Sequence, residues 1–113
     1  MESILISIKK LLGITADYNH FDADIIIHIN SILSVLTQMG VGPSEGFSIQ
    51  DEFAKWTDFI PNTQNIELVK TYVHQRVRMI FDPPTNSSVI EAIQRSIAEL
   101  EWRISVIADR GAV

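Results

Sequence analysis

The segment Phe81-Asp82-Pro83-Pro84 is the strongest constraint on how this chain can fold. A residue that precedes proline is pushed out of the α region, and proline has no N–H with which to continue a helix. A helix that reaches this segment must therefore end there. Asn86, Ser87 and Ser88 follow, and all three residue types begin helices well. Ser88 and Glu91 also have the spacing of a capping box. The pattern predicts a C-terminal hairpin of two helices joined by this break.

Apolar residues recur with a helical period along most of the chain, so the predicted fold class is all-α. The length of 113 residues is typical of a single domain, and we expect one helical unit over 1–113. Glycine and proline residues mark the predicted helix ends. The result is a small bundle of about five helices, predicted over Glu2–Leu12, Asp22–Met39, Glu52–Phe59, Ile66–Phe81 and Ser88–Ala108.

The remaining segments carry three further expectations. Asp22 is predicted to cap the second helix. The stretch 40–51 is rich in glycine and irregular, and we expect Phe47 and Ile49 to form a short extended piece that packs back on the core. Phe53 and Trp56 share a face of the third helix and are expected in the core. The tail 109–113 is expected to fray.

Composition excludes several classes of protein. The formal net charge of −5 argues against a uniformly basic nucleic-acid binder. The chain has no cysteine, so it has no disulfide framework and no thiolate metal site. No apolar run approaches the roughly 20 residues that span a bilayer, and no basic-then-apolar leader is visible. The expectation is a soluble protein, made in the cytoplasm, with no membrane association.

The fifth predicted helix is apolar on two sides. Ile93, Ile97, Leu100, Ile104 and Ile107 form a core stripe with a 4, 3, 4, 3 spacing. Trp102 lies about 180° from Ile93 around the helix, with Ala98 and Val106 four residues to either side. This second stripe is covered either by another segment of the same chain or by another subunit. Tryptophan is enriched among interface anchors, so Ala98, Trp102 and Val106 are candidate subunit-interface residues. A ladder of alternating charge, Glu91, Arg95, Glu99 and Arg103, is predicted to pair along the solvated face.

The fourth predicted helix repeats this pattern and adds a basic side. Its core stripe is Ile66, Val69, Val73, Val77 and Ile80, and its second stripe is Leu68, Tyr72 and Met79, which are also candidate interface residues. Lys70, His74 and Arg78 lie four residues apart on a third side. They are candidate DNA-facing residues, although a plain solvated face is the favoured reading in so acidic a chain.

Motifs for chemistry are missing. The three histidines lack metal-ligand spacing. A set of His20, Asp22 and Asp24 can be drawn as a metal site, but capping explains Asp22 better. No phosphate loop or nucleophile elbow is present. The sequence therefore predicts no catalytic residues, no metal and no cofactor, and a protein that is not an enzyme.

The chain resembles the head–tail connector proteins of tailed bacteriophages, also called adaptor, head-completion or DNA-packaging proteins. Three groups of segments carry the resemblance, and together they cover nearly the whole chain. The first runs from Leu12-Gly13-Ile14 through Asp17-Tyr18 and Phe21-Asp22-Ala23-Asp24-Ile25-Ile26 to His28-Ile29-Asn30-Ser31. The second comprises Gly40-Val41-Gly42-Pro43, Gly46-Phe47, Trp56 and Asp58-Phe59. The third runs from Val69-Lys70-Thr71-Tyr72-Val73 through the proline break to Glu99-Leu100-Glu101-Trp102-Arg103.

The resemblance implies a structural virion protein at the head–tail junction. Such subunits form a ring under the portal, commonly about twelve-fold, through repeated head-to-tail contacts. The ring extends the DNA channel and docks the next head-completion or tail protein. The implied partners are further copies of this chain, the portal protein and a downstream head-completion or tail protein. DNA would pass through the channel without sequence-specific binding. A nucleic-acid-binding helical module and a helical dimerisation or regulatory module are the alternatives.

Overall fold

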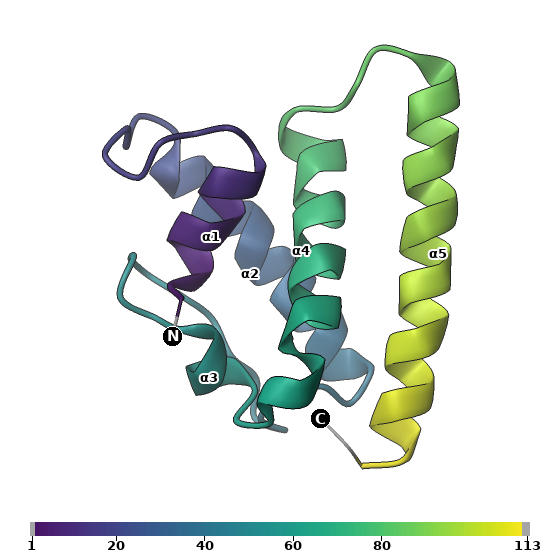
Figure 1. Ribbon diagram of the computed structural model, residues 1–113. Coiled ribbons are helices and arrows are strands. Elements are labelled where there is room, and N and C mark those ends of the chain that lie inside the picture. Colours follow the sequence, from purple (N-terminus) through teal and green to yellow (C-terminus); the bar gives the residue numbers. More distant parts are fainter. Residues whose placement is uncertain (1, 112–113) are drawn as a thin grey trace.

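The computed structural model describes residues 2–111, and these residues form helices joined by loops, which confirms the all-α prediction (Figure 1). Their only β pairing is an isolated bridge between Ser3 and Lys55. The elements, in chain order, are α1 (Ile4–Leu11), α2 (Asp22–Gln38), α3 (Trp56–Phe59), the 3-10 turn η1 (Thr63–Asn65), α4 (Ile66–Phe81) and α5 (Ser87–Asp109).

Helix α4 is the centre of the bundle. It packs against α2, α5 and α1, and Figure 1 shows it between α1 and α5. Four residues of its predicted core stripe are buried: Ile66, Val69, Val73 and Val77. Ile80 is 50% exposed, so its assignment to the core is wrong. It lies in the last turn of α4, just before the chain leaves the packed layer at the proline break.

The predicted C-terminal hairpin is confirmed. Helix α4 ends at Phe81, and Asp82 leaves the helical region with φ −148° and ψ 67°. Asn86 caps α5, because its Oδ1 accepts hydrogen bonds from the backbone N–H groups of Ser88 and Val89 at 2.8 and 3.3 Å. The capping box predicted at Ser88 is wrong, since α5 begins one residue earlier. Of the predicted frayed tail, Asp109 is still helical, and residues 112–113 lie outside the described range.

Asp22 does not cap α2 as predicted, and its contact with Lys9 helps to hold the loop between α1 and α2 in place. Phe21 holds the cap position, and Asp22 is the first helical residue. The Asp22 carboxylate lies 2.8 Å from Nζ of Lys9, whose side chain is 1% exposed. The contact is electrostatic, because the carboxylate oxygen makes no hydrogen bond of acceptable geometry. Nζ also donates to the Ala16 carbonyl at 3.1 Å. A buried lysine needs such partners, and together they hold the α1–α2 loop against α1.

The segment between α2 and α3 is irregular but anchored. The Asn30 side chain bonds both the N–H and the carbonyl of Ile49, at 2.7 and 2.9 Å. Ile49 is buried, and the ring of Phe47 packs 5.3 Å from that of Phe59, so the predicted return of this segment to the core is confirmed. A β-carbon on Gly42 would lie 2.4 Å from the Phe59 ring. Only glycine fits there.

Helix α3 is shorter than predicted. Asp58 accepts a hydrogen bond from the Lys55 backbone N–H at 2.9 Å, and the helix begins only at Trp56. Trp56 is fully buried as expected, and its indole N–H donates to the Ser7 hydroxyl at 2.8 Å. Phe53 precedes the helix and is 75% exposed, so its predicted place in the core is wrong.

Candidate interaction surface on helix α5

Helix α5 packs on one side only. Leu100 and Ile104 are 7% and 1% exposed and face α4, whereas Trp102, between them in sequence, is 68% exposed. Ala98 is also exposed, and Val106 is half-buried. Within residues 2–111, no segment covers the tryptophan. We call Ala98, Trp102 and Val106 the outer face of α5.

Charged side chains border this outer face. Seven residues before Trp102, Arg95 lies about 20° away around the helix, and Glu99 lies about 60° away. The ladder of Glu91, Arg95, Glu99 and Arg103 is exposed, and none of its members forms an ion pair within the described part of the chain. The expectation of paired charges is therefore wrong. The charges remain available, and a rim of available charge around an aromatic side chain is typical of protein interfaces.

The second stripe of α4, unlike that of α5, is covered within the subunit. Tyr72 is fully buried, and its hydroxyl donates to the Glu101 carboxylate on α5 at 2.7 Å. Nη1 of Arg76 donates to the same hydroxyl at 2.7 Å and to Glu101 at 3.1 Å. Burial, together with the bond to Glu101, raises the pKa of Tyr72 to about 12. The phenol therefore stays protonated and ties α5 to α4.

This placement corrects one interface prediction. A partner subunit cannot reach Tyr72. Leu68 is partly buried against the core, and Met79 is half-buried. A helix with two apolar sides needs two partners, and α4 finds both within the subunit because it lies between α2 and α5.

The predicted basic stripe is largely neutralised. Nζ of Lys70 lies 2.7 Å from a Glu2 carboxylate oxygen and 2.9 Å from one of Glu67. Burial opposes the charge on Lys70, but the hydrogen bonds to both carboxylates prevail and raise its pKa. The hydrogen bond from Lys70 lowers the pKa of Glu2 despite partial burial.

His74 and Arg78, the other two residues of the basic stripe, do not form a basic surface either. Burial, followed by the nearby Arg78 charge, lowers the pKa of His74 despite a hydrogen bond to the Leu11 backbone. Its Nε2 is buried without a hydrogen-bond partner. Arg78 forms no ion pair among residues 2–111. The three residues thus present one unpaired charge and not a continuous basic surface.

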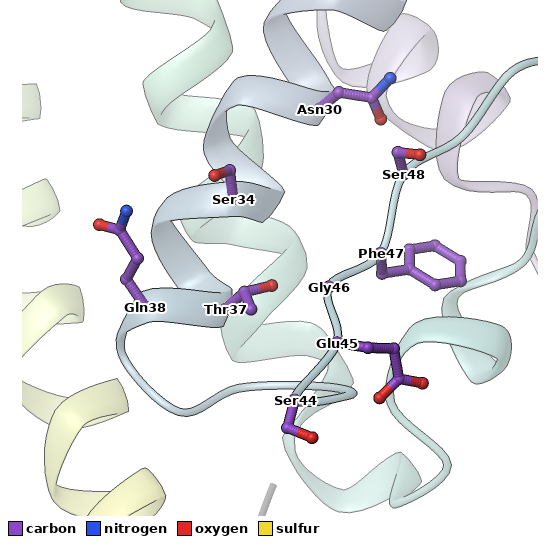
Figure 2. Close-up of a pocket in the computed structure, with 9 residues that line it drawn as sticks. All are labelled: Asn30, Ser34, Thr37, Gln38, Ser44, Glu45, Gly46, Phe47 and Ser48. Carbon is purple, nitrogen blue, oxygen red and sulfur yellow. The ribbon is translucent and has the colours of Figure 1, made fainter.

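Two shallow grooves were not predicted from the sequence. One, of about 360 Å³, lies between the outward side of α1 and the loop after it, lined by Ile6, Lys10, Gly13, Ile14, Thr15 and Ala16. The other, of about 510 Å³, is polar and lies between α2 and residues 44–48 (Figure 2). Figure 2 shows Ser34 and Thr37 of α2 across from the loop, while the Phe47 ring points away from α2. The sequence did not indicate either groove, because each lies between a helix and an irregular loop, and helical periodicity does not predict the path of a loop.

No group of histidine and carboxylate side chains between residues 2 and 111 is arranged to hold a metal ion. In the same range, none of the helices combines the length and apolar character needed to span a bilayer.

Comparison with known proteins supplies the family. The model of the family described as phage connector protein matches residues 4–111, which includes every helix above and both grooves. Among curated proteins and among solved structures, no significant match was found. Because the family model covers almost the whole chain, this chain belongs to the phage connector proteins.

Proposed function

We propose that this protein is the subunit of a ring beneath the portal of a tailed phage. Membership of the connector family makes it a structural virion component that joins head and tail. In the proposed assembly, copies contact one another head to tail, in about twelve-fold order to match the portal. The ring extends the DNA channel and offers its free end to the next head-completion or tail protein.

The exposed Trp102 carries this proposal. Trp102 is 68% exposed and presents a large apolar surface to water, whereas Leu100 and Ile104 on the opposite side of α5 are buried. Large aromatic residues of this kind act as anchors at protein interfaces. Ala98, beside it, is small and lets a partner approach the helix closely. The outer face of α5 therefore supports one of the two surfaces that a ring subunit needs.

The alternative functions have less support. A nucleic-acid-binding module would need a free basic surface, and Lys70 is paired with two carboxylates. A dimerisation module would use the same outer face but would stop at two copies. Salt-sensitive retention on DNA would favour the nucleic-acid-binding module. A defined dimer that does not bind portal protein would favour the dimerisation module.

The test is the mass of the protein in solution, with and without purified portal protein. Sedimentation velocity and electron microscopy of the mixture should show ring-shaped assemblies of this chain on the portal. A chain that remains monomeric at high concentration and never binds portal would refute the proposal.

A further inference from the structure

We propose that the outer face of α5 docks into the apolar groove beside α1 on the next copy of this chain, with Trp102 as the inserted residue. The inference rests on the proposed ring and names the surface that receives the tryptophan. A closed ring requires two different patches on opposite sides of each subunit. The outer face supplies only the first of them.

The groove is suited to an aromatic side chain. Its volume of about 360 Å³ is lined in part by the apolar side chains of Ile6 and Ile14 and the methyl group of Ala16. Gly13 adds no side chain to this lining, and a β-carbon built there would meet no atom within 4 Å. Lys10 lines the same groove, and its cationic head can lie over an indole ring. The loop that forms one wall is held in place by the buried Lys9.

The two surfaces offer one complementary pair of charges, Lys10 and Glu99, although Arg95, which has the same sign as Lys10, also borders the outer face. Lys10 is exposed and forms no ion pair within residues 2–111. Glu99, one helical turn from Trp102, is equally exposed and unpaired. An indole seated in the groove would bring these two charges to the same rim, where opposite charges favour the correct partner.

The positions of the surfaces fit a head-to-tail contact. Trp102 faces away from α4, and the groove lies on the outward side of α1. Figure 1 shows α4 between α1 and α5, so the helices that carry the two surfaces lie on opposite sides of α4 in this view. A subunit cannot satisfy its own tryptophan, and each docking leaves one tryptophan and one groove free for the next copy.

The two other most exposed apolar residues do not offer a similar receptor. Phe53 and Ile27 are 75% and 64% exposed and protrude from the surface. Neither lines either of the two grooves described above. The second groove is lined mainly by serine, threonine and amide side chains, which would leave an indole poorly matched.

Cross-linking tests this contact directly, because the chain has no native cysteine. We would make Lys10→Cys and Glu99→Cys as single variants and treat them with a short bis-maleimide, with and without portal protein. The mixture should give a covalent dimer, while each variant alone should remain uncross-linked. The double variant should give a ladder of oligomers. Ile27→Cys, at an exposed site outside both surfaces, is the matched control and should link to neither.

Adding Trp102→Ala to the Glu99→Cys chain should reduce the dimer yield about tenfold or more. Circular dichroism checks that each variant is folded. Rings that form on portal without a link between positions 10 and 99 would overturn the groove and leave the proposed function intact. The same holds if the portal alone covers the outer face. If each variant links to itself, the contact is two-fold, which overturns the groove and favours the dimerisation module over the ring. Failure of the unmodified chain to assemble, alone or with portal, would instead refute the ring.

Discussion

Replacing Trp102 with alanine should impair assembly far more than folding. The side chain is 68% exposed, so of about 250 Å² of tryptophan surface roughly 170 Å² remains for a partner to bury. At about 25 cal/mol per Å² this is a gross stabilisation of about 4 kcal/mol. Ordering the side chain and desolvating its N–H reduce the net value, so we expect a loss of about 2–4 kcal/mol. That corresponds to roughly 30- to 700-fold weaker association.

The cost to folding should be smaller. The buried third of the side chain, about 80 Å², stabilises the subunit by at most about 2 kcal/mol. The better helix propensity of alanine returns up to about 0.5 kcal/mol. Urea unfolding followed by circular dichroism measures this term, and sedimentation velocity with portal protein measures assembly. The control is Ile27→Ala, which removes a side chain that is 64% exposed on α2. Unfolding of Trp102→Ala, or unchanged assembly, would refute the reasoning.

Three further predictions concern the interior of the subunit. Gly42→Ala should lower the free energy of unfolding by about 2–5 kcal/mol, because Gly42 has φ +78° and a β-carbon would overlap the aromatic ring beside it. Gly46→Ala, at φ +97° with nothing within 4 Å, should lose only the backbone part, and equal losses in urea melts would contradict the overlap. Tyr72→Phe removes the hydrogen bond to the half-exposed Glu101 and should cost about 1 kcal/mol; a neutral result would mean that this bond does not hold α5. His74 has a pKa below its usual 6.5 because of burial, so the unfolded chain binds a proton more readily. Its contribution is present above about pH 6.5 and is lost as the pH falls through the folded pKa. The stability difference between wild type and His74→Gln should therefore shrink from about pH 7.5 to about pH 5, and a constant difference would show that His74 does not titrate.

Local rules predicted the helices well. The proline break ended α4 at Phe81, as a missing N–H and steric restriction require. Gly13 and Gly40 follow the ends of α1 and α2 at positive φ, where other residues are strained. Several local predictions failed at helix starts, as at Asp22 and Ser88. A helix cap requires a polar side chain that reaches a free backbone N–H. The Asp22 carboxylate instead pairs with the buried Lys9, whose Nζ also donates to the Ala16 carbonyl.

The spacing of apolar residues is enough to show that α4 and α5 each carry two apolar sides, because spacing fixes the direction of each side chain around a helix. Which of these sides is covered depends on how the helices pack. Tyr72 and Trp102 occupy equivalent second stripes, yet one is fully buried and the other is 68% exposed. The physical reason is position in the bundle: α4 has helices on both flanks, whereas α5 packs mainly on α4. Periodicity shows that an apolar side needs a partner, and packing shows whether the same chain provides it.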